Sequence, residues 1–89
     1  MGRSFTRIAL HTRHGYVSDV ELDDDEVGVV FVSRVTYVDR FVEAKLFDTN
    51  TWLMMESGLD EYIRDHEESW LTYMFVKNGE VVDQVKIFD

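Results

Sequence analysis

The sequence predicts an α+β fold in which one amphipathic, acidic helix packs on a face of an antiparallel sheet of about six strands. Three observations support this prediction. Strand-like runs fill the first half of the chain, a single segment after them has helical periodicity, and an Asn-Gly dipeptide joins two further strand-like runs at the end. The expected order is β-β-β-β-α-β-β, within one domain spanning residues 1–89.

The first half of the chain is rich in alternating and β-branched residues, which are typical of strands. Strands are expected at residues 4–12, 16–22 and 27–38. His14 and Gly15 are expected to form the turn between the first two strands. The acidic run DDDE at 23–26 is expected to separate the second strand from the third.

The segment that follows is ambiguous. Val42, Ala44 and Leu46 alternate and favour a fourth strand over 39–47. The spacing of Val38, Phe41, Val42 and Lys45 also fits a helix. Residues 48–51 are expected to form a loop. Residues 52–56 either begin the helix early or form a short connection.

The helix is predicted from residues that recur at steps of three and four, which places them on one side. This apolar face comprises Leu59, Tyr62, Ile63, His66 and Trp70. Ser57 is the expected N-cap, because a serine hydroxyl can accept a hydrogen bond from a free backbone N–H of the first turn. Arg64 is expected to pair with Asp60 and Glu68, each four residues away.

The end of the chain, residues 70–88, is predicted to form a hairpin around Asn78–Gly79. That dipeptide suits a two-residue turn in which both residues have positive φ. Counting outward from the turn places Val76 opposite Val81 and Met74 opposite Asp83. Both faces are largely apolar, so the hairpin is expected to lie centrally or to meet another molecule on one face.

The composition excludes several kinds of chemistry. Without cysteine, the chain forms no disulfide, thiolate nucleophile or cysteine zinc site. The three histidines, His11, His14 and His66, do not form a recognisable catalytic or metal-binding pattern with other residues. We therefore expect no enzymatic activity, no cofactor, and no catalytic or metal-ligating residue.

No apolar run is long enough to cross a membrane, and neither a membrane span nor a leader segment is expected. A soluble protein in the cytoplasm of a bacterial or archaeal host cell is expected.

The charge balance is the strongest global feature. The chain has 18 acidic and 9 basic residues and a net charge of −9. Phosphate backbones and anionic lipid surfaces repel such a chain, so neither direct nucleic-acid binding nor membrane binding is expected. Basic protein surfaces attract it. Solubility alone is the alternative explanation for this charge.

The first hypothesis is an inhibitor that docks on a basic nucleic-acid-binding protein or enzyme. Acids one helical turn apart repeat about every 5.4 Å, a spacing of the same order as that of phosphates along a strand, so nucleic-acid mimicry is one mechanism. In size and charge, the chain resembles phage anti-CRISPR and anti-restriction proteins and bacterial immunity proteins. The carboxylates expected to bind the partner form two groups: Asp23, Asp24, Asp25 and Glu26 in the first, and Asp60, Glu61, Asp65, Glu67 and Glu68 in the second.

An apolar anchor is expected to supply most of the affinity of this docking. The candidates are Trp52, Met54 and Met55, for which core filling is the alternative role. The second hypothesis is a non-enzymatic oligomeric subunit, structural or scaffolding, of a virion or another complex. Exposed strand edges would pair between its chains. A closed multimer would favour this second hypothesis, whereas a monomer or a homodimer is compatible with the first.

Overall fold

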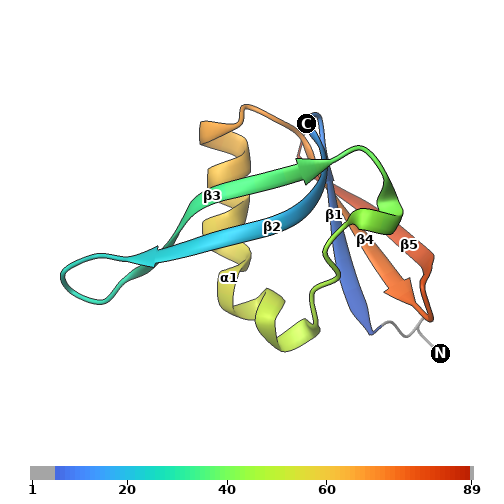
Figure 1. Ribbon diagram of the computed structural model, residues 1–89, viewed down its shortest axis with the longest axis horizontal. Coiled ribbons are helices and arrows are strands. Elements are labelled where there is room, and N and C mark those ends of the chain that lie inside the picture. Colours follow the sequence, from blue (N-terminus) through green and yellow to red (C-terminus); the bar gives the residue numbers. More distant parts are fainter. Residues whose placement is uncertain (1–5, 89) are drawn as a thin grey trace.

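The computed structural model describes residues 6–88, which form an antiparallel sheet of five strands with one α-helix across a face (Figure 1). The strand order is β3-β2-β1-β4-β5. The strands are β1 (Arg7–Thr12), β2 (Gly15–Asp24), β3 (Val30–Val38), β4 (Leu71–Lys77) and β5 (Glu80–Phe88). The helical segments are η1 (Phe41–Glu43), α1 (Thr49–Glu61) and η2 (Tyr62–His66). The expected α+β class is confirmed, whereas the sixth strand is absent from this part of the chain.

The prediction of a strand over 39–47 was wrong. The segment contains the 3₁₀ turn η1 and no strand. It contacts the sheet through a bridge, in which Ile8 and Phe47 exchange backbone hydrogen bonds of 2.8 Å, and through the Lys45 N–H, which donates to the Val17 carbonyl oxygen at 2.9 Å. β1 pairs with β2 only near their shared turn, which leaves the edge of β1 at Ile8 open for this bridge. Val42, one of the alternating apolar residues, is 76% exposed. The burial of Phe47, and not an alternating strand pattern, therefore determines how this segment packs on the sheet.

Helix α1 begins well before the position that the sequence suggested. Asp48 is its N-cap, and its Oδ1 accepts a hydrogen bond from the Thr51 backbone N–H at 2.7 Å. The predicted loop at 48–51 is therefore the cap and first turn, and Ser57 lies inside the helix instead of capping it. Residues 52–56 belong to the helix, as one of the two alternatives expected, and are not a separate connection.

The helix ends in a π turn, and this changes which side chains face the sheet. The Glu67 N–H donates to the Tyr62 carbonyl oxygen five residues back, at 3.2 Å. Beyond Ile63 the apolar stripe no longer follows the expected period, because a π turn holds more residues than an α turn. His66 is exposed and stacks on the Tyr62 ring, so its expected place on the buried face was wrong.

The C-terminal hairpin is confirmed at its turn and corrected in its register. Asn78 and Gly79 have φ of 53° and 80°, and Val76 pairs with Val81 as expected. A bulge follows, so Met74 pairs with Gln84 instead of Asp83. β4 lies inside the sheet, whereas β5 is its edge strand.

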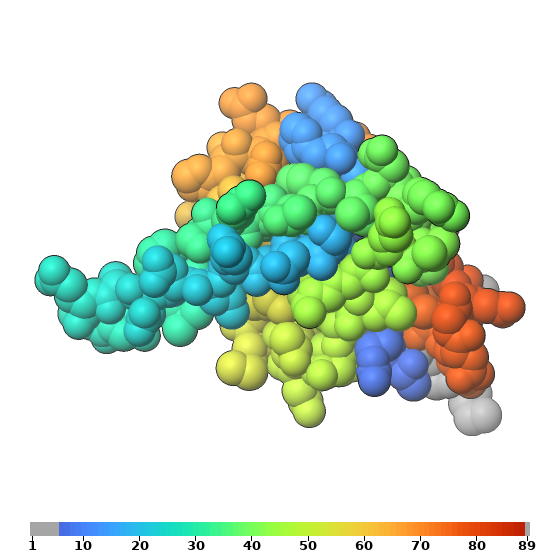
Figure 2. All heavy atoms as spheres, viewed as in Figure 1, coloured from blue at the N-terminus to red at the C-terminus, as the bar shows by residue number. Residues whose placement is uncertain are grey.

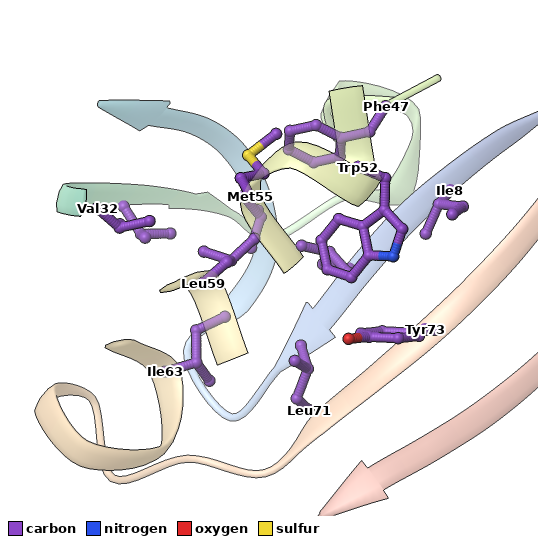
Figure 3. Close-up of a cluster of buried hydrophobic side chains, with 12 residues drawn as sticks. Ile8, Val32, Phe47, Trp52, Met55, Leu59, Ile63, Leu71 and Tyr73 are labelled. Atoms are coloured by element: carbon purple, nitrogen blue, oxygen red, sulfur yellow. The ribbon is translucent and has the colours of Figure 1, made fainter. Parts of the chain in front are cut away.

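The main core lies between the sheet and α1 (Figure 3). It comprises Ile8, Leu10, Val17, Val32, Val35, Phe47, Trp52, Met55, Leu59, Ile63, Leu71 and Tyr73. A smaller cluster of Ala9, Met74 and Val76 occupies the opposite face of the sheet, where Tyr16, Phe41 and Val81 pack against it. Within residues 6–88, no helix is long and apolar enough to span a membrane.

Strands β2 and β3 continue beyond this core as a projecting hairpin (Figures 1 and 2). We call residues 21–31 the arm; every one of them is exposed. Its turn is closed by Asp25, whose Oδ1 accepts hydrogen bonds from the Val27 and Val29 N–H groups at 2.9 and 3.0 Å. Asp23 and Asp24 belong to β2, so the acidic run only partly separates the strands.

Candidate functional site

A groove of about 640 Å³ lies between the arm and α1. We call it the α1–arm groove. Its arm wall is formed by four residues of the arm and by Val32, which directly follows it: Leu22, Val29, Val30, Phe31 and Val32. Its helix wall is formed by Thr51, Met54, Met55, Ser57, Gly58, Glu61, Tyr62, Asp65 and His66. The volume falls within the range of about 300–1,000 Å³ that is common for binding pockets.

The two walls of this groove carry large apolar side chains that the fold leaves uncovered. Met54 is 89% exposed, and Val30 is 62% exposed. Leu22, Val29 and Phe31 are also exposed. Single exposed apolar residues are ordinary on protein surfaces, but a contiguous group of them marks an interaction surface.

Gly58 is the point at which α1 and β3 approach each other. A Cβ atom added at Gly58 would lie 3.8 Å from Cγ2 of Val32, which is ordinary van der Waals contact. Val32 is itself buried and belongs to the main core. The groove is therefore built on the core at this point, and the exposed part of the arm continues outward from it.

Two of the predicted acidic residues, Glu61 and Asp65, lie on the helix wall. Arg64 forms its ion pair with Asp65, with Nε 3.2 Å from Oδ1, and not with Asp60 or Glu68 as expected. Both side chains are more than half exposed, so this pair adds little stability and solvent screens it. No lysine or arginine is among the described residues that line the groove.

Asp60 is half-buried and points toward β4. Its Oδ1 and Oδ2 accept hydrogen bonds from the Tyr73 hydroxyl at 2.7 and 2.9 Å. Burial raises the pKa of Asp60 above its ordinary value, although the hydrogen bond from Tyr73 opposes this shift. Asp60 therefore connects α1 to β4 and does not extend the acidic surface.

The last two acids of the helix group lie apart from the groove. The Glu67 Oε2 is 3.8 Å from Nε2 of His14, and its carboxylate lies near Tyr37. Burial raises the pKa of the Tyr37 phenol, and the charge of Glu67 raises it further. Glu68 is exposed at the end of the helical segment, where its φ is 50°.

The acids of the arm are all exposed, and they lie where the arm wall of the groove continues toward the turn. They comprise Asp23, Asp24, Asp25 and Glu26, which were predicted to bind the partner, and also Glu21. The structure thus places this group, together with Glu61 and Asp65, along the arm and groove, and it separates Asp60, Glu67 and Glu68 from them.

The three residues expected to form an apolar anchor have different positions. Trp52 is 4% exposed and packs edge-on against Tyr73, with ring centroids 4.8 Å apart, so it fills the core. Met55 is buried beneath the groove, and Met54 projects into solvent beside it.

The apolar residues of the arm were missed as candidate binding residues. The signal that could have identified them is the apolar run Val29, Val30 and Phe31 directly after an acidic turn. They were assigned only to the strand expected over 27–38, with no binding role.

Residues 6–88 contain no group of three or more His, Asp or Glu side chains arranged to hold a metal ion. His11 stacks on Tyr16 with centroids 4.3 Å apart, and burial lowers the pKa of its imidazole. Comparisons with protein-family models, with curated proteins and with solved structures find no match to this chain.

Proposed function

We propose that this protein is a small inhibitor that docks on a basic, nucleic-acid-binding protein. The observation that carries the proposal is an exposed apolar groove bordered by carboxylates and without lysine or arginine in its described lining. Apolar side chains supply affinity in such interfaces, while charge complementarity accelerates association and selects the partner. The net charge of −9 acts in the same direction over longer distances.

The test begins with capture of host proteins on the immobilised chain, followed by elution in a salt gradient. The proposal expects basic, nucleic-acid-binding proteins that elute at moderate salt, because charge attraction is screened as salt increases. Added nucleic acid should compete with the chain for the captured protein. Captured proteins that are acidic, or that nucleic acid fails to displace, would contradict the proposal.

A pair of variants separates the acidic groove surface from net charge. The first variant is Glu26→Gln, Glu61→Gln and Asp65→Asn. It neutralises one acid of the arm and the two acids of the helix wall. The control is Asp39→Asn, Glu43→Gln and Glu80→Gln, three exposed acids that lie neither in the arm nor in the groove lining. Both variants have the same net charge, so only the first should lose affinity for the captured partner. Equal losses would assign the interaction to net charge alone.

A second candidate function, an oligomeric structural or scaffolding subunit, is supported by the edge strand β5. Its Val85 and Ile87 are 44% and 39% exposed on an outer strand of the sheet. Such an edge can pair with another chain. Sedimentation velocity distinguishes the two functions: a closed multimer at low concentration would support the second, and a monomer would support the first.

A further inference from the structure

The α1–arm groove follows the helix and has the dimensions of a helical ligand. Thr51, Met54, Gly58, Glu61 and Asp65 all line it, and they recur along α1 and η2 at steps of three and four. From Thr51 to Asp65 the groove runs for about 20 Å, given a rise of 1.5 Å per helical residue. A second helix of about four turns matches this length.

The middle of the helix wall is formed by small residues, so the wall is lowest there. Gly58 and the small residue Ser57 lie there, between the larger side chains of Met54 and Tyr62. Small residues let the backbones of two helices approach closely, and helices pack with axes about 8–10 Å apart. An amphipathic helix whose apolar face enters such a groove is a recurrent mode of peptide recognition.

The charges around the groove determine the chemistry of its ligand. Glu61 and Asp65 lie on one wall, and the other wall leads to the acidic turn of the arm. Lysine or arginine residues flanking the apolar face of a bound helix would face these carboxylates. The exposed Met54 adapts to apolar side chains of different shape because its side chain is unbranched and flexible.

The same charges disfavour a second copy of this chain as the ligand. A symmetric contact through the groove would bring Glu61 and Asp65 of one copy close to the same residues of the other. Two chains that each carry a net charge of −9 also repel each other before contact.

We infer that the α1–arm groove binds an amphipathic helix of the partner protein, with leucine-like residues on its inner face and basic residues on its flanks. This inference rests on the proposed function, because it takes the partner to be basic. It adds the form of the partner segment and the residues of this chain that hold it.

The probe is a 15-residue synthetic peptide of leucine and lysine, with leucines spaced three and four apart. Two control peptides are a scrambled version, whose leucines do not share a face, and a version with glutamate in place of lysine. Amide chemical shifts of the ¹⁵N-labelled protein are followed during titration. Shifts concentrated at residues 29–32 and 51–66 are expected for the first peptide only. Equal binding of the glutamate version would overturn the inference.

Two substitutions then separate groove binding from simple charge attraction. Met54→Asp places a charge in the groove, whereas Leu53→Asp places the same charge on the neighbouring residue, which is 65% exposed and does not line the groove. Charge attraction alone would tighten binding of the basic peptide equally in both variants. Groove binding expects Met54→Asp to weaken it about tenfold or more, the size of the loss of one central apolar contact. Unchanged or tighter binding to Met54→Asp would overturn the inference.

The outcomes also separate this inference from the proposed function. A partner captured in a salt-sensitive manner by both wild type and Met54→Asp would leave the proposed function standing and overturn the groove as the helix site. Peptide binding that Met54→Asp abolishes, together with no capture of a basic host protein by the wild type, would support the groove as a helix site and contradict the proposed function. A dimer that Met54→Asp dissociates in sedimentation experiments would identify a second copy as the ligand and overturn the inference.

Discussion

Asp60 and Tyr73 illustrate how a single hydrogen bond decides the role of a carboxylate. Burial of Asp60 raises its pKa in the folded protein, and the Tyr73 hydroxyl offsets part of that shift by donating to both carboxylate oxygens. A raised folded-state pKa means that the folded protein binds the proton more tightly than the unfolded chain. The contribution of Asp60 to stability therefore falls as pH rises from about 3.9 through the raised value.

We expect Tyr73→Phe to lower the free energy of unfolding by about 1–2 kcal/mol at neutral pH, because a half-buried carboxylate loses its donor. The loss should be smaller at acid pH, where Asp60 is protonated. Asp60→Asn keeps an acceptor but cannot titrate, so it should remove this part of the pH dependence. Urea unfolding of the two single variants and the double variant measures both effects. Identical pH profiles for wild type and Asp60→Asn would contradict the assignment.

Gly15 and Gly79 lie at two hairpins with different surroundings. Gly15 begins β2 directly after a turn at Arg13–His14, one residue earlier than expected, and Gly79 lies in the turn between β4 and β5. Gly15 has a φ of 126°, and a Cβ atom there would lie 2.6 Å from the Val38 carbonyl oxygen. Gly79 has a φ of 80° and open space around it. We expect Gly15→Ala to cost about 3 kcal/mol, from strain plus the backbone clash, and Gly79→Ala to cost about 1 kcal/mol, from strain alone. Thermal unfolding of both variants checks this order, and equal costs would refute it.

At the scale of elements, local signals predicted the two hairpins, but long-range packing decided the rest. Asn78–Gly79 specifies its turn by its own conformational preference, so that turn was predictable. The bulge after Val76 and the bridge between Ile8 and Phe47 depend on neighbouring strands, which a single sequence does not reveal. The start of α1 was expected too late because serine is a common N-cap residue and Ser57 was taken as the cap, whereas Asp48 caps the helix.

The candidate site was predictable only in part, for a related reason. Acidic side chains and Met54 were identified from their residue types, because charge and size are local properties. The groove itself depends on the arm crossing α1, with Val32 close to Gly58. The π turn was also not predictable, and it places both Asp65 and the exposed His66 on the groove wall.

Gly58 offers a test of the helix as an element. It lies inside α1, and a methyl group there would make an ordinary contact with Val32. We expect Gly58→Ala to raise the free energy of unfolding by about 0.5–1 kcal/mol, because alanine favours helix and restricts the unfolded chain. Chemical denaturation measures this gain. The added methyl group should also weaken binding of the leucine–lysine peptide, and a destabilised variant would contradict the regular helix at this position.

At the scale of the whole molecule, a packed body carries an arm that contributes little to the core. The principal axes are 43 × 25 × 22 Å, and the radius of gyration is 13.1 Å, somewhat above the value of about 12 Å expected for a compact domain of this length. Residues 21–31 are all exposed, whereas the main core lies between α1 and the inner part of the sheet. Stability and partner binding can therefore be altered separately in this protein.

Shortening the arm tests that separation directly. Leu22 pairs with Val32, so residues 23–31 can be replaced by Asn-Gly, which suits a two-residue turn between these strands. Because the removed side chains are exposed, we expect Tm to change by less than about 4 °C, equivalent to less than about 1 kcal/mol.

The shortened protein should nevertheless lose its binding to the leucine–lysine peptide and to the captured host protein, because one wall of the groove and four carboxylates are removed with the arm. Circular dichroism melting curves and the salt-gradient capture measure the two effects on the same variant. A control that replaces only Val27 with serine keeps both walls and should bind normally, since Val27 does not line the groove. A large fall in Tm would show that the arm supports the core, and unchanged capture would show that the partner binds elsewhere.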